Sequence, residues 1–237
     1  MAVAFRASSF VSSNIVATAD PIVVAPVGLA DGDLILVQIA IGANTTMVDP
    51  PGNGFTLIHE LGDSGGDGRI GAMYKLASGE GASWTFTGLF GGGAVTGIAG
   101  ALCYTGVHQT TPTSGTATEA APATSTTPAC TAFLPGVDNC MLVSMFGCDP
   151  SAGMTGTEGT GWTERGDAAL SGEGFVYFQE KLQTTATSEG GSFTASTTDT
   201  FGCIQVALQP AAGGGRVTRN TRTIDLGTAI GMNWRSG

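Results

Sequence analysis

Residues 62–66 read Gly-Asp-Ser-Gly-Gly, a string that surrounds the nucleophilic serine in one class of serine proteases, and His59 lies five residues before Ser64. In those enzymes the histidine and the aspartate lie far upstream of the serine, because the catalytic residues converge from two barrels. Only 63 residues precede Ser64, which leaves no room for that arrangement. We therefore interpret residues 62–66 as a glycine-rich connection between two strands.

Other residues that could bind a metal or transfer a proton do not form a recognisable pattern. Asp49, Asp63 and Asp67 could approach one calcium ion from neighbouring loops, but they lack the Asp-x-Asp-x-Asp-Gly spacing of a calcium loop. His59 and His108 have no cysteine or histidine at the spacing of a metal site. No pair of carboxylates is set apart as an acid–base couple. We expect no catalytic residue, no metal and no cofactor, and hence a protein that is not an enzyme.

The cysteines give no sign of a disulfide framework. There are five of them, an odd number, and no two have the Cys-x-x-Cys spacing; they are Cys103, Cys130, Cys140, Cys148 and Cys203. Paired cysteines in secreted domains normally come in even numbers. We therefore expect buried, reduced thiols that pack as small hydrophobic residues.

The composition favours an all-β chain with an acidic body. Only 12% of the 237 residues are charged and 38 are glycine, which disfavours helices and favours short strands joined by tight turns. The net charge is −10. Residues 213–237 hold four arginines and one aspartate, a net +3, so the rest carries five basic and eighteen acidic residues, a net −13. An acidic body argues against nucleic acid as a partner.

The chain carries no recognisable targeting or membrane segment. No positively charged start leads into an apolar run, so we expect no signal peptide and synthesis in the cytoplasm. The most apolar stretch, residues 34–41, is much shorter than the roughly 20 residues that span a bilayer. We therefore expect no membrane partner.

Two halves of the chain share one plan at an offset of 106 to 109 residues. Residues 32–41 correspond to residues 138–147, and both stretches are apolar enough for central strands. Gly54-Phe-Thr matches Gly161-Trp-Thr, and two alternating strands each end in Lys-Leu, at residues 75–76 and 181–182. Glu80-Gly-Ala-Ser-Trp matches Glu189-Gly-Gly-Ser-Phe. The halves therefore predict the same set of about four strands.

Four short strands expose an apolar face that a second sheet must cover. We therefore expect a single jelly-roll-like β-sandwich made from two quasi-duplicated halves that close face to face. Half one covers about residues 20–107, residues 108–128 cross over, and half two covers about residues 129–210, all within one unit of residues 1–210. Two separate small sandwiches remain the alternative.

Residues 211–237 lie outside the repeat and begin with a glycine-rich joint at residues 211–215. Apolar residues alternate with cations after the joint, so an extended C-terminal arm could add a strand to an exposed sheet edge. A disordered tail is the other interpretation. The residues expected to make contacts are Arg216, Arg219, Arg222, Ile224, Leu226, Trp234 and Arg235.

Four short motifs resemble β-sandwich structural proteins of tailed bacteriophages and prophages. They are Gly32-Asp-Leu-Ile-Leu-Val, the Gly-Phe-Thr and Gly-Trp-Thr strings, Tyr74-Lys-Leu-Ala, and Ala101-Leu-Cys-Tyr-Thr-Gly-Val. The resemblance covers roughly residues 20–210 and does not include the arm. It implies a β-sandwich used for head decoration, head fibres or tail modules, and it implies no catalytic residues.

Composition and resemblance together predict a virion structural protein, a capsid decoration or cement protein or a head-fibre protein. Its expected partners are copies of itself and other virion proteins, the major capsid protein first. The alternative is a tail-associated or adhesin module that binds host glycans by stacking sugars on tryptophan. Trp84 and Trp162 match phenylalanines in the other half, which favours core packing for both. A hydrolase on the same scaffold is a third possibility.

Overall fold

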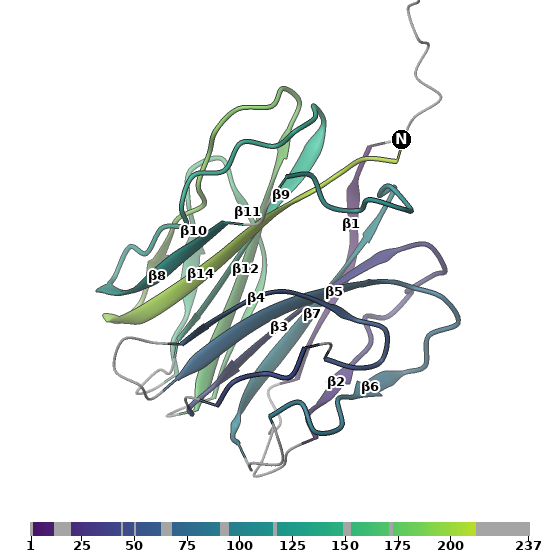
Figure 1. Ribbon diagram of the computed structural model, residues 1–237. Coiled ribbons are helices and arrows are strands. Elements are labelled where there is room, and N and C mark those ends of the chain that lie inside the picture. The colour runs from purple at the N-terminus through teal and green to yellow at the C-terminus, as the bar shows by residue number, and fades with distance from the viewer. Residues whose placement is uncertain are drawn as a thin grey trace, which may run out of the picture.

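The computed structural model describes residues 2–11, 20–43, 45–49, 51–62, 68–90, 95–115, 118–148, 153–170 and 173–211. Within these residues the chain forms strands and turns and no helix, and most strands lie in two large sheets that pack against each other (Figure 1). The all-β sandwich expected from the composition and from the repeat is therefore confirmed.

Repeat one, the part of the chain from β1 to β7, supplies one sheet and one small ribbon. The strand order in the sheet is β1-β7-β3-β5-β4, and β2 pairs with β6 in the ribbon. All pairs are antiparallel. The strands are β1 (Ala4–Val11), β2 (Ile22–Val24), β3 (Leu34–Ile41), β4 (Thr56–Gly62), β5 (Arg69–Leu76), β6 (Ser83–Thr85) and β7 (Gly97–Thr105).

Repeat two, from β8 to β14, builds the second sheet with the same order. The order is β8-β14-β9-β12-β11, so each strand takes the place of its counterpart in repeat one, and β10 pairs with β13. Each sheet comes wholly from one half of the chain. The strands are β8 (Thr118–Ser125), β9 (Cys140–Cys148), β10 (Gly156–Glu158), β11 (Thr163–Leu170), β12 (Gly174–Gln183), β13 (Phe193–Ala195) and β14 (Asp199–Leu208).

Each sheet has five strands instead of the expected four, because β1 and β8 join as edge strands. Strand β1 precedes residue 20, and β8 lies inside residues 108–128, the expected crossover. Their sequences, Ala-Phe-Arg-Ala-Ser-Ser-Phe-Val and Thr-Glu-Ala-Ala-Pro-Ala-Thr-Ser, lack the apolar run of a central strand. Small polar residues and proline are tolerated at a sheet edge, so such strands leave a weak pattern.

The inner faces of the two sheets bury each other in one central core. Leu36 and Leu102 from repeat one belong to the same buried cluster as Val143 and Val206 from repeat two. Burying each such side chain contributes about 1.5–3 kcal/mol. Beside this core Arg165 of β11 pairs with Glu180 of β12 and lies 4.3 Å from the ring centre of Phe5 in β1. The sheets are thus joined by apolar packing and by a charged group that reaches across.

Each sheet is also covered on its outer face by its own ribbon and loops. In repeat one the outer cluster contains Val37, Met73, Trp84 and Phe86. In repeat two, two outer clusters contain residues such as Phe146, Phe193 and Trp162. Burial on both faces explains why every residue of β3 and β9 is buried.

The face assignments correct the register of the repeat in the central strand. The sequence match at an offset of 106 aligns Leu36 with Leu142, but Leu36 points into the central core and Leu142 into an outer cluster. Val143, at an offset of 107, faces the central core instead. Because side chains alternate between faces, a shift of one residue exchanges the two faces of a strand. Both strands are apolar on both sides, so the sequence alone did not reveal the shift.

The expectation that all cysteines are reduced is wrong for two of them. Cys130 and Cys203 form a disulfide, with Cα atoms 5.3 Å apart, that ties the segment after β8 to β14. Cys103 and Cys140 are free thiols, and they and Cys148 are buried, as expected. The paired residues are 73 positions apart in sequence. Only the folding of the segment after β8 over the outer face of the sheet brings them together.

Gln38 is a polar side chain of the central core whose hydrogen-bonding groups are unused. Gln38 of β3 is fully buried, and neither its amide nitrogen nor its amide oxygen has a hydrogen-bond partner. Its counterpart in repeat two is Met145, which packs in the same core. By contrast, Gln205 of β14 accepts bonds from the Ser144 hydroxyl and the Gly191 amide and donates to the Glu189 carbonyl.

We predict that Gln38→Met raises the free energy of unfolding by about 1–3 kcal/mol, because it removes two unsatisfied buried groups. Gln205→Met is the matched control and should lower it by a similar amount, since it leaves three partners unpaired. Denaturant titration of the two variants beside the wild type measures both changes. A loss of stability in Gln38→Met would show that its amide is satisfied in solution.

Candidate functional site

Most of the residues singled out for possible chemistry lie outside the described part of the chain. Ser64, Asp63 and Asp67 are among them, and so are the arm residues Arg216, Arg219, Arg222, Ile224, Leu226, Trp234 and Arg235. The described residues contain no group of three or more His, Cys, Asp or Glu side chains that could hold a metal ion. They also contain no helix long and apolar enough to cross a membrane.

The two described tryptophans are core residues, as their exchange with phenylalanine predicted. Trp84 is 4% exposed and its ring centre lies 5.3 Å from that of Phe55. Trp162, the counterpart of Phe55, is 7% exposed. Neither ring presents a face on which a sugar could stack, so these two residues weigh against a glycan site.

Charged pairs occupy equivalent positions in both repeats and hold equivalent loops. Lys75 pairs with Glu80, and Lys181 pairs with Glu189. The turns that contain these glutamates are fixed a second time by aspartates. Asp31 accepts a hydrogen bond from the Gly79 amide at 2.7 Å, and Asp138 accepts one from the Ala186 amide at 2.8 Å. These carboxylates therefore hold the turns in place.

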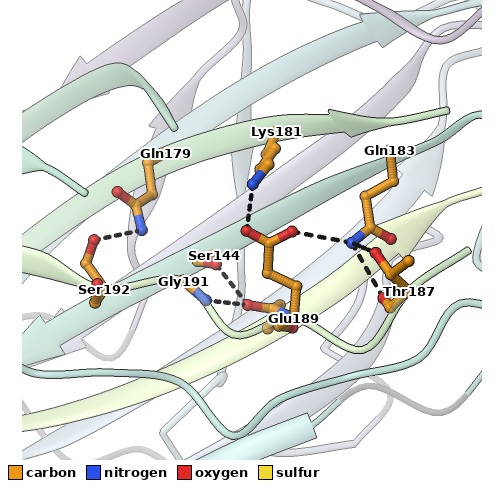
Figure 2. Close-up of polar contacts among 9 residues, drawn as sticks. Ser144, Gln179, Lys181, Gln183, Thr187, Glu189, Gly191 and Ser192 are labelled. Atoms are coloured by element: carbon orange, nitrogen blue, oxygen red, sulfur yellow. Dashed lines mark hydrogen bonds and ion pairs between the residues drawn. The ribbon is translucent and has the colours of Figure 1, made fainter. Parts of the chain in front are cut away.

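In repeat two, polar side chains point outward from the outer face of the sheet and form hydrogen bonds and an ion pair with residues 187–192 (Figure 2). Gln179 donates to the Ser192 carbonyl, and Gln183 donates to Thr187 and to the Glu189 carboxylate. Three of the outward positions, Ser144, Gln179 and Gln205, are fully buried. Their counterparts in repeat one are Val37, Met73 and Ala101, which are apolar. The two repeats thus hold their covering loops by different means.

Repeat one has a groove on its surface between residues 24–31 and the turn at residues 77–82, with a volume of about 530 Å³. Its lining is mainly apolar, with Val24, Val27 and Leu29 on one side and Ala77 and Ala82 on the other. Asp31 and Glu80 also line it. We call this feature the groove. Sequence analysis missed it, because it depends on how two loops with no common motif pack together.

Exposed apolar side chains gather on one wall of the groove and next to it. Val27 is 89% exposed and Val24 is 43% exposed, while Ile22, close by on the same strand as Val24, is 53% exposed. Within the described residues, β2 pairs with β6 alone. Leu134, which is 60% exposed, occupies the position of Val27 in repeat two. Adjacent proline and glycine residues at both tips were the sequence signal that could have revealed these positions.

The pKa of Glu80, which lines the groove, and the pKa of Glu164 in β11 are shifted in opposite directions, so the electrostatics of each can be tested by pH dependence. Burial disfavours the charged form of Glu80, but hydrogen bonds from Lys75, Trp84 and the Ser78 amide outweigh burial and lower its pKa. The pKa of Glu164 is raised by burial and by the charges of Asp167 and Glu158. Ionised Glu80 therefore stabilises the fold above its unfolded pKa, whereas ionised Glu164 destabilises it.

We predict that Glu80→Gln lowers the free energy of unfolding at pH 7 by about 1–2 kcal/mol, since bonds to a charged group are lost. The deficit should shrink as the pH falls through the lowered pKa of Glu80. Glu164→Gln should stabilise at pH 7, and that gain should shrink as the pH falls through its raised pKa. Thermal unfolding of both variants and the wild type between roughly pH 3 and 8, the range in which carboxylates titrate, checks the sign of each change. Curves of stability against pH that run parallel for the variants and the wild type would refute the assignment of the two pKa shifts.

No family model, no curated protein and no solved structure matches this chain. The function is therefore inferred from the geometry of the described residues. The charged pairs and amides described above hold loops, and the groove has an exposed apolar wall. The arrangement is suited to binding another polypeptide surface.

Proposed function

We propose that the protein is a virion structural protein of a bacteriophage, a capsid decoration or cement protein or a head-fibre protein, that acts through protein–protein contacts. The observation that carries the proposal is the groove, whose wall includes Val24 and Val27 with large exposed fractions. Exposed apolar clusters of this kind mark sites of interaction in soluble proteins. The short motifs that resemble phage sandwich proteins support a bacteriophage particle as the place where the protein acts.

The partners proposed are copies of the same chain and other virion proteins, with the major capsid protein first. The C-terminal arm, with Arg216, Arg219, Arg222 and Arg235, is a second contact element in this proposal. The body has a net charge of −13, which supports an assembly without nucleic acid as partner and gives the cationic arm acidic surfaces to bind.

The disulfide supports the proposal that the folded protein functions outside the reducing cytoplasm. A disulfide persists in oxidising surroundings, such as the exterior of a released particle, and is rare in cytosolic proteins. Synthesis in the host cytoplasm followed by oxidation after release accounts for Cys130–Cys203. The glycan-binding alternative loses support because Trp84 and Trp162 are buried.

The proposal predicts that the protein co-purifies with phage particles. Particles induced from a bacterial culture that encodes the protein are banded on a density gradient, and the bands are probed with an antibody against residues 1–211. We expect the protein in the particle band and antibody label at regular positions on capsids in electron micrographs. Recovery of the protein only from the soluble fraction, with the major capsid protein present in the band as control, would contradict the proposal.

A further inference from the structure

The C-terminal residue of the described chain lies at the same end of the molecule as the groove. The Ala211 amide donates a hydrogen bond to the Gly106 carbonyl at 2.7 Å. Three residues after Gly106, the side-chain amide of Gln109 donates a hydrogen bond to the Gly32 carbonyl at 2.9 Å. Gly32 follows Asp31, which lines the groove. The arm therefore leaves the body a few residues from this apolar surface.

The arm has the length and residue types to fill the groove. Residues 212–217 can span up to about 20 Å when extended, which brings Val217 within reach of the lining. Beyond Val217 the segment supplies Ile224, Leu226, Ile230, Met232 and Trp234 as apolar groups. An extended segment of this kind can pair with an edge strand and place alternate side chains in a groove.

The charges of the two surfaces are complementary. Residues 213–237 carry a net +3, and the body carries −13. The groove contains the exposed carboxylate of Asp31, and its described lining contains no cation, while the Glu80 carboxylate that also lines it is already paired with Lys75. Arginine side chains that flank the apolar residues of the arm can thus meet the Asp31 carboxylate while the apolar groups are buried.

We propose that the groove receives residues 213–237 of its own chain. Attachment at residue 211 gives the arm a high effective concentration at a site so close by, so modest contacts are enough to keep it bound. The inference concerns the isolated chain: a virion partner that binds the groove would have to displace the arm, so the two proposals are tested separately. A failure of the particle experiment would leave it standing, and its own failure would leave the particle experiment valid.

Digestion of the full-length protein with an arginine-specific protease tests this inference, because Arg216, Arg219 and Arg222 lie in the arm. The groove variant is Val24→Lys with Val27→Lys. The control is Leu134→Lys with Val137→Lys, which adds the same charge at exposed apolar positions of repeat two. Lysine adds no cleavage site for this protease, and near-ultraviolet circular dichroism verifies that each variant is folded.

We expect cleavage in the arm to be at least about tenfold faster in the groove variant than in the wild type, because proteolysis follows the population of the undocked segment. The control should behave as the wild type, and the rates should not change with protein concentration. Equal rates in wild type and groove variant would overturn the proposal, as would equal acceleration in the control. Protection that increases with protein concentration would overturn it too, because a neighbouring copy's arm would then fill the groove.

Discussion

The inner faces of the two sheets can be removed from water only by each other, and this mutual burial determines the rest of the architecture. Leu36 and Leu102 on one sheet are buried in the same cluster as Val143 and Val206 on the other. Because the halves meet through their inner faces, ribbons and loops must cover the outer faces. Two of these covering loops also form the groove, the surface at which we propose that the protein meets a partner.

The two repeats keep a common frame and differ in how they hold their outer loops. Lys75–Glu80 and Lys181–Glu189 occupy equivalent places. The buried amides of Gln179 and Gln205 bind the covering loop of repeat two through its backbone. Repeat one has apolar residues at those positions, and its groove opens between two loops. A duplicated fold can thus preserve its core while one copy opens a groove on its surface.

The sequence predicted what depends on strong local pattern. The apolar runs of β3 and β9 and the exchange of Phe55 with Trp162 indicated the sandwich and the buried tryptophans. Edge strand β8 was missed because its small residues and proline form no apolar alternation. The disulfide and the groove could not be foreseen, since Cys130 meets Cys203, and residues 24–31 meet residues 77–82, only through tertiary packing.

Mutual burial of the two sheets implies that the repeats unfold together, and single-tryptophan reporters measure this directly. Trp84 reports on repeat one and Trp162 on repeat two, each in a variant whose other tryptophans, Trp234 included, are replaced by phenylalanine. The structure predicts denaturant transitions that coincide in midpoint and slope, as expected for one cooperative unit. Two separate transitions, one for each reporter, would show that the repeats are independent domains and would contradict the shared core.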